Sequence, residues 1–567
     1  MQRAHSLAAG LAAASALAAL PAAAAAEGGH TGRTWYVQAG AAEGTGSFAS
    51  PFGSLAEVEA ASGPDDRIAV LSGPPTAAPL DGGIALKPRQ RLAGLGPGSR
   101  ITNTDATRNQ GAGVVLADGV EVANLHVLDT ARAGMVGHDV SGVRIRGNLI
   151  TGFNRSNGVN YCFSGIVVPV VGCFITPHPA IDLRLDEPGR EQSIRISGNA
   201  IRDAQGSGIT VRAAGSARAT LRIARNRLEN LDVNLVPGAG QIQHSEGVLV
   251  NTFDRARANV RLTGNLYDSI GTGASNSDTN LFVLDGASRQ KVRIAGDVRR
   301  NTERVGGPSA TAIEVWGPLT EAPGARLDLV VEDGDYRGMT SDAIQMARGG
   351  GNIAIRATVA DTFIGEGIGA GPPMPPPGVP LFNSGSCIHV GERIGGGTTP
   401  SPSPTSIWLD VIRSRLEGCK SAGITFQNAP ELESGRLRIR DSHLAGNGLA
   451  NLWVESFPVV QTEPKARLSV SAADSDFVGS PRGIVILDAT RQTAASVIDL
   501  GGGPLGSPGR NRILRNGTDV EVAGLAVSAT RNWWGSPSGP EPGQILLSGG
   551  ATLTTRPVLA TDPRPDR

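Results

Sequence analysis

Lysine, aromatic residues and net charge are all in short supply in this chain of 567 residues. It has only four lysines, and Phe, Trp and Tyr together make up 4% of it. The 52 Lys and Arg residues are balanced by 52 Asp and Glu residues, so the formal net charge at pH 7 is zero. Nucleic-acid-binding proteins usually carry a basic excess. The charge balance therefore argues against a nucleic-acid partner.

Long apolar runs are missing after the first 26 residues. Residues 1–26 combine a charged start at Arg3, a run of Ala and Leu, and a cluster of small residues near Ala26. This order is that of a secretory signal peptide. No later stretch is long and apolar enough to cross a bilayer. We therefore predict a secreted or periplasmic protein without a membrane span.

What the chain has instead is a repeated two-part unit. Residues 193–213 contain two short patterns of alternating apolar residues: the first includes a turn at Gly198 and Asn199, and the second begins after a break at Gly208. A side-chain period of two indicates β-strands. The first inward residue of the second strand recurs in steps of 28 to 44 residues, at Ile209, Val248, Leu281, Ile313, Ile344, Ile388, Ile424, Leu452 and Ile484. Such a recurrence predicts one coil of a solenoid per step, with loops of variable length. The 77 glycines and the few aromatic residues suit tight coils with an aliphatic interior.

Over residues 34–555 this repeat resembles the right-handed parallel β-helix of the pectate-lyase-like superfamily. Residues 34–58 look like the opening strand and cap of secreted bacterial members, and Asn532-Trp533-Trp534-Gly535 looks like their closing rung. Asparagines at the turn of successive units look like the family's asparagine ladder, at Asn148, Asn199, Asn226 and Asn265.

The predicted fold is therefore all-β, a single-stranded right-handed parallel β-helix with an N-terminal cap. We expect a signal peptide at 1–26, the cap and first coils at 27–110, the β-helix body at 111–555 and a disordered tail at 556–567. A short amphipathic helix at 54–63 could cover the open end, where unpaired strand groups would otherwise invite aggregation. A solenoid that grows from one chain is expected to be a monomer.

The four cysteines predict disulfides, because an even number in an exported chain usually pairs. Three pairings are open, and no spacing suggests zinc. We favour Cys162–Cys173, which closes a short loop, together with Cys387–Cys419. The second pair precedes two successive second strands, which would lie on neighbouring rungs about 4.8 Å apart.

Outward residues are the candidates for binding, because inward residues fill the core. Aligning the second strands gives two outward columns that mix carboxylates, amides, arginines and tryptophans, with Phe282 among them. This mix is typical of sugar sites. The predicted substrate-binding residues are Arg184, Arg212, Trp316, Gln345, Gln427, Trp453 and Glu455. Each outward tryptophan either contacts a ligand or lies under a loop.

Glu314 and His389 are the candidates for catalysis. They should lie two rungs apart, roughly 10 Å, and could act as general acid and base; the alternative is that both are merely solvated. Asp182 and Asp186 could hold Ca²⁺, but we favour a surface patch of salt bridges as the account of this cluster. No other cofactor is expected.

The resemblance does not identify a reaction. ThrProHisPro at 176–179 is only superficially similar to the Asp-Pro-His-Asp of alginate epimerases, because both acidic positions are missing. We therefore predict a protein that binds an extracellular or cell-envelope polysaccharide along an outward sheet face. Whether it also cleaves or epimerises the polymer, as a lyase, hydrolase or epimerase would, stays open. The alternative is a non-catalytic structural or adhesive protein.

Overall fold

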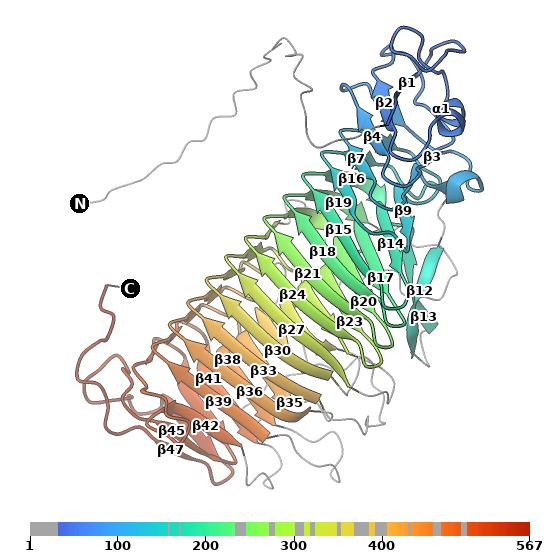
Figure 1. Cartoon of the computed structure of the whole chain (residues 1–567). Helices are drawn as coiled ribbons and strands as arrows, with labels where there is room; N and C mark the ends of the chain where they lie inside the picture. Colours follow the sequence, from blue (N-terminus) through green and yellow to red (C-terminus); the bar gives the residue numbers. More distant parts are fainter. Residues whose placement is uncertain are drawn as a thin grey trace, which may run out of the picture.

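The chain coils into a rod built from three long parallel sheets (Figure 1). The structure, a computed structural model, describes residues 32–156, 159–168, 172–232, 245–270, 278–300, 311–317, 324–348, 353–367, 385–391, 405–428, 432–456, 467–488 and 496–566. The predicted signal peptide lies outside these residues. The predicted right-handed parallel β-helix is confirmed. In the described part of the chain, no helix is long and apolar enough to cross a membrane.

Each coil contributes one strand to each sheet in turn. Sheet A contains β1 (Thr34–Gln38), β2 (Arg67–Leu71), β4 (Arg91–Gly94), β7 (Glu121–Ala123), β10 (Val143–Arg146), β15 (Glu191–Ser197), β18 (Arg218–Ala224), β21 (Arg257–Thr263), β24 (Arg289–Ala295), β27 (Ala325–Glu332), β30 (Ile353–Ala360), β33 (Thr405–Ile412), β36 (Leu432–Arg440), β39 (Arg467–Ala473), β42 (Val497–Gly501), β45 (Ala526–Ala529) and β47 (Thr552–Thr554). Sheet B contains β5 (Arg100–Ile101), β8 (His126–Leu128), β11 (Leu149–Thr151), β16 (Ala200–Gln205), β19 (Arg227–Asp232), β22 (Leu266–Ile270), β25 (Val298–Arg300), β28 (Asp335–Arg337), β31 (Phe363–Gly365), β34 (Arg415–Glu417), β37 (His443–Ala445), β40 (Asp476–Val478) and β43 (Arg512–Leu514). Sheet C contains β3 (Ile84–Ala85), β6 (Val114–Val115), β9 (Met135–His138), β14 (Ile181–Leu185), β17 (Ile209–Ala213), β20 (Val248–Thr252), β23 (Asp278–Leu284), β26 (Thr311–Trp316), β29 (Ile344–Arg348), β32 (Ile388–Val390), β35 (Ala422–Asn428), β38 (Ala450–Ser456), β41 (Arg482–Asp488), β44 (Thr518–Ala523) and β46 (Ile545–Ser548).

Three further elements lie outside the sheets. They are α1 (Leu55–Ala61), the 3₁₀ turn η1 (Arg108–Gly111) and an antiparallel hairpin of β12 (Val159–Val168) and β13 (Gly172–Pro177). The helix predicted at 54–63 is thus present as α1. The Ser54 hydroxyl caps its first turn by accepting the Glu57 N–H. The Glu57 carboxylate in turn accepts the Ser54 N–H. Leu55 and Val58 point from α1 into the core. That α1 covers the open end of the rod stays a prediction.

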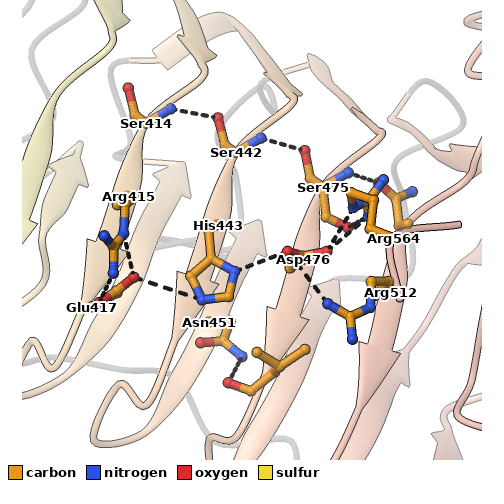
Figure 2. Close-up of polar contacts among 12 residues, drawn as sticks. Ser414, Arg415, Glu417, Ser442, His443, Asn451, Ser475, Asp476, Arg512 and Arg564 are labelled. Atoms are coloured by element: carbon orange, nitrogen blue, oxygen red, sulfur yellow. Dashed lines mark hydrogen bonds and ion pairs between the residues drawn. The ribbon is translucent and has the colours of Figure 1, made fainter. Parts of the chain in front are cut away.

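The predicted asparagine ladder is present at the turn from sheet A to sheet B. The Nδ2 of Asn148 donates to Oδ1 of Asn199 at 3.0 Å, and Asn199 donates to Asn226 in the same way at 2.9 Å. Asn226 continues to Asn265, and Asn265 to the carboxylate of Asp297. Serine and threonine hydroxyls take over on later coils, as Figure 2 shows for the step from Ser414 to Ser442 to Ser475, where each N–H donates to the next hydroxyl. These bonds join successive coils on the buried side of the turn.

The interior of the coil is mostly aliphatic, but it includes a charged side chain in sheet B. Its inward position is apolar on most coils, as at Ile201 and Leu228, but Arg299 occupies it on β25. Tyr267 and Tyr336 lie in register on the two neighbouring strands. Arg299 is buried and donates to the Thr279 hydroxyl at 3.0 Å and to the Arg337 carbonyl at 3.1 Å. A charged residue therefore lies inside the coil, flanked by two buried tyrosines.

One of the two predicted disulfides is confirmed. Cys387, just before β32, is bonded to Cys419, just before β35, with their Cα atoms 5.5 Å apart. The two cysteines join neighbouring coils, as the repeat predicts. The side chains of Cys162 and Cys173 lie outside those that the structure describes.

The C-terminal segment differs from the prediction of a disordered tail. Residues 556–566 follow a defined path along the last coils. Arg564 donates to the Asp476 carboxylate at 2.8 Å, and Asp562 pairs with Arg512 at 3.1 Å (Figure 2 shows Asp476 between Arg512 and Arg564). A polar segment at the end of a chain is often disordered, but the buried carboxylate of Asp476 on sheet B gives this segment a partner.

Candidate functional site

The outer face of sheet C carries the predicted columns of outward residues. Glu314, Gln345 and His389 lie in register on β26, β29 and β32. The residues on either side of each belong to the core inside the coil, so these three side chains point away from it. The flanking core residues are Ile313, Val315, Ile344, Met346, Ile388 and Val390. Their predicted direction is therefore correct, and so is their stacking over two rungs.

These outward residues are nevertheless buried, which differs from the expectation of an open groove. The exposed fraction is 0% for Glu314, 2% for His389 and 0% for Trp453. Trp316, Gln345, Gln427 and Glu455 are buried as well. The period of two gives the direction of a side chain, but it does not show what covers it.

Trp453 shows how this cover is built. Its ring packs in a second apolar cluster, outside the coil, with Ala422, Leu449, Ala450, Val485 and Leu487. The indole N–H donates to the Glu455 carboxylate at 2.8 Å. Of the two readings for an outward tryptophan, the covered one therefore fits Trp453, and Glu455 serves as its hydrogen-bond partner.

The register at β23 also differs from the sequence alignment by one residue. Asn280, rather than Leu281, pairs with Val248 and Ile313 and points inward. Phe282 consequently lies in the core and not in the outward column. Five consecutive buried residues, Asn280 to Leu284, show no alternation from which the register could be derived.

His389 belongs to a buried relay of three polar side chains. Its Nδ1 lies 2.9 Å from Oδ2 of Asp342, and its Nε2 lies 2.9 Å from Oε1 of Gln427. Asp342 also accepts the N–H groups of Gly385 and Ser386. Burial opposes ionisation of Asp342, but His389 and these N–H groups together hold its pKa below the usual value. Asp342 and Gln427 can orient the imidazole of His389, but the burial of this ring separates it from a polymeric substrate.

An open pocket lies nearer the N-terminal end of the same face. It is a cavity of about 590 Å³ whose polar lining comprises Gln110, Arg132, His138, Ser156, His178, Asp182 and Arg184. Of the predicted site residues, only Asp182 and Arg184 lie here, and they form an ion pair at 3.5 Å. Arg212 follows Arg184 in register on β17, but it does not line the cavity.

Calcium is not supported by the arrangement of the two predicted aspartates. Asp182 pairs with Arg184, while the Asp186 N–H donates to the Asp139 carboxylate at 2.6 Å. Within the described ranges, no group of three or more His, Cys, Asp or Glu side chains could hold a metal ion. The salt-bridge reading of this cluster fits the geometry.

His178 and Arg132 are pocket residues that the sequence did not single out as a site. Burial, together with the charges of Arg132 and Arg184, lowers the pKa of His178 to about 4. The imidazole is therefore neutral at neutral pH, beside two guanidinium groups. The only sequence signal was the superficial motif ThrProHisPro, which contains His178.

Comparison with known proteins finds only remote structural similarity. No protein-family model matches the chain, and no curated protein matches its sequence. Among solved structures it is similar to tailspike protein 3 of bacteriophage CBA120, with 8% identity, 93% of this chain and 62% of that chain covered, and a TM-score of 0.32. It is also similar to a mannuronan C-5 epimerase A-module from Azotobacter vinelandii, with 9% identity, 93% and 100% covered, and a TM-score of 0.27. A pectate lyase gives 12% identity, 79% and 76% covered, and a TM-score of 0.21. With TM-scores below 0.5 these likenesses carry no argument; the parallel β-helix is established by the three long parallel sheets of the chain itself.

Proposed function

We propose that the protein is exported and binds an acidic polysaccharide in the Arg184 pocket on the outer face of sheet C. The observation that carries this proposal is the open cavity of about 590 Å³ with Arg132 and Arg184 in its lining. The Cys387–Cys419 disulfide supports export, because disulfides persist in oxidising compartments.

The lining of the pocket suits a uronate sugar. A guanidinium group is a planar fork that binds a carboxylate through two parallel hydrogen bonds. Arg132 and Arg184 provide two such groups, and the pairing of Arg184 with Asp182 fixes its orientation. The amide of Gln110 and the hydroxyl of Ser156 can bind sugar hydroxyls.

Proton abstraction beside the carboxylate is the reaction that this pocket supports best. A general base must be unprotonated at the working pH. His178, with its pKa lowered to about 4, meets that condition, but the same shift makes it a weaker base than an imidazole whose pKa lies nearer the working pH. A polysaccharide lyase or an epimerase begins with such a step, so activity on polyuronates is the form of turnover to seek.

Binding and turnover can be tested with a panel of polyuronates and neutral glucans. Losing one charge-assisted hydrogen bond costs about 1.5–3 kcal/mol, so Arg184→Gln should weaken polyuronate binding by about tenfold or more. Arg212→Gln is the matched control, because Arg212 is the next residue in register and lies outside the pocket lining. Equal losses in both variants, or no loss in Arg184→Gln, would contradict the pocket. If turnover occurs, His178→Gln should abolish it and leave binding in place.

A non-catalytic structural role is the second candidate function. The observation that favours it is the burial of Glu314, His389 and Trp453, since covered groups stabilise the rod and do not meet a polymer. Absence of binding and turnover across the panel, with a large loss of stability in Trp453→Ala, would favour this role.

A further inference from the structure

The outer face of sheet A is strongly basic over three consecutive strands. Figure 1 shows β18, β21 and β24 side by side in the middle of the rod. The outward positions of these strands carry seven exposed cations, Arg218, Arg222, Arg257, Arg261, Arg289, Lys291 and Arg293. No outward position of these three strands carries a carboxylate. A chain without net charge thus concentrates positive charge on one face.

The cations are stacked in columns by the register of the sheet. Arg218, Arg257 and Arg289 are direct partners on neighbouring strands, as are Arg222, Arg261 and Arg293. Neighbouring strands lie about 4.8 Å apart, and like charges directly opposite one another are destabilising. Such stacking therefore costs stability unless another group neutralises it.

Acidic side chains relieve this repulsion only at the border of the patch. Arg293 pairs with Glu332 of the next strand, β27. Among the residues that the structure describes, the other six cations have no carboxylate partner. Glu191, beside Arg218, and Asp328, beside Lys291, mark the two ends of the patch. The cations in the interior of the patch are therefore not neutralised by the protein and can bind an anionic ligand.

A shallow groove follows the first column of arginines. It has a volume of about 400 Å³, and its charged lining comprises five cations, Arg218, Arg257, Arg289, Lys291 and Arg326, and two carboxylates, Glu191 and Asp328. Asp328 pairs with Arg326, and Thr220 and Asn259 lie between the charges. Because the groove crosses successive strands, its long direction follows the axis of the rod. A linear molecule lying in it would meet one cation on each coil.

We propose that this basic face of sheet A binds a linear anionic polysaccharide, at a second site separate from the pocket on sheet C. Repeating carboxylate or sulfate groups match the repeating guanidinium groups in sign and arrangement. Single-stranded nucleic acids are bound by combining such charges with aromatic side chains on which the bases stack. The outward positions of β18, β21 and β24 carry no aromatic residue. The face therefore fits a sugar polymer better than a nucleic acid.

The test replaces the first column with Arg218→Gln/Arg257→Gln/Arg289→Gln and measures binding of polygalacturonate and dextran sulfate at several salt concentrations. Binding should weaken by at least tenfold. Its dependence on salt should become shallower by about 2 in log–log slope, as removal of three cationic contacts predicts for a linear polyanion. The melting temperature should stay the same or rise, because stacked like charges have been removed.

The matched control is Arg356→Gln/Arg436→Gln/Arg440→Gln, which removes the same charge from exposed positions on β30 and β36 of the same sheet. This control should bind as the unmodified protein does. Equal losses in both triple variants, or none in the first, would overturn the proposal. Preferential binding of single-stranded DNA at the same salt would overturn the assignment to polysaccharide. Failure of the Arg184 pocket is seen separately, because Arg184→Gln leaves the sheet A face intact.

Discussion

Asp297 occupies a ladder position at which the four preceding coils carry asparagine. Its Oδ1 accepts the backbone N–H of Asn265 at 2.9 Å, and its Oδ2 lies 3.3 Å from the hydroxyl of Tyr267. Burial raises the pKa of Asp297 to about 7, although these hydrogen bonds oppose the rise. The carboxyl group is thus protonated in the folded protein at a pH at which an unfolded chain would ionise it.

This difference predicts that stability falls as the pH rises from about 4 to 7. The unfolded pKa is about 3.9, so between these values the folded state holds a proton that the unfolded state has lost. By linkage the penalty grows over this window and levels off above pH 7, at about 4 kcal/mol for three units. Asp297→Asn keeps the acceptor and cannot ionise, so it should be the more stable form at pH 8. Thermal melting of both forms from pH 4 to 8 measures this.

A second carboxyl group with a raised pKa means that the stability of Asp297→Asn still depends on pH. Burial raises the pKa of Asp519 to about 6. This carboxyl group therefore also makes the folded protein less stable as the pH rises. The variant should therefore have a shallower slope between pH 4 and 7, and Asp519→Asn in the Asp297→Asn background should flatten it further. An unchanged slope in Asp297→Asn would show that this carboxyl is ionised in the folded protein.

For single residues, the sequence predicted the direction in which a side chain points better than it predicted what surrounds that side chain. Alternation identified the outward positions of Glu314, His389 and Trp453, because the period of two is a local property of the backbone. It could not show that they are buried, since Trp453, for example, is covered in part by Ala422 and Val485 of neighbouring coils. Asp342 and His178 escaped notice because neither belongs to the strand alternation that guided the search.

At the scale of elements, the coils were predictable where apolar and polar residues alternate cleanly. The register of β18, β21 and β24 follows directly from their matching patterns. At β23 every residue is buried, so hydrophobic pattern alone could not distinguish one register from the next. Only the tertiary partner decides it: inward Asn280 accepts the hydroxyl of Tyr267 at 3.0 Å.

The disulfide between neighbouring coils should stabilise its own part of the rod. Cys387 and Cys419 are 32 residues apart, and closing a loop of this length is worth about 4 kcal/mol in the chain-entropy estimate. A solenoid is stabilised mainly between nearest neighbours. Cys387→Ala/Cys419→Ala should therefore speed hydrogen exchange in β32 and β35 while β18 exchanges as before. A uniform change along the rod would contradict this local effect.

The contacts that hold the C-terminal segment, residues 556–566, against the last coils can be tested by mutation. Arg564 donates two hydrogen bonds to Asp476 and one each to the carbonyls of Ser475 and Arg510. Arg564→Ala removes all four, so residues 556–566 should become open to a broad-specificity protease while the coils stay resistant. Arg556→Ala is the control, since Arg556 makes one long hydrogen bond at 3.4 Å. Equal cleavage in both variants would show that Arg564 does not fix the segment.

At the scale of the whole molecule, the rod presents faces of different chemistry. Sheet A carries the stacked arginines, while the outer face of sheet C bears the Arg184 pocket and, further along, a second buried layer around Trp453. Net charge, the first quantity that the sequence offers, concealed this division because it sums over all faces. A prediction of partners from composition therefore missed the basic face, although the strand patterns that build it were already legible.

The columns of arginine on sheet A also form a ruler. Backbone hydrogen bonds between coils fix the interval between the Cα atoms of successive arginines at about 4.8 Å. The charges repeat at that interval on average, because each guanidinium lies at the end of a flexible side chain. A polymer whose charges repeat at that interval, or a multiple of it, stays in phase with every coil it crosses. One with another period drifts out of step within a few residues. Selection among anionic polymers on this face would then depend on how well the spacing of their charges matches the spacing of the coils, rather than on the chemistry of any single contact.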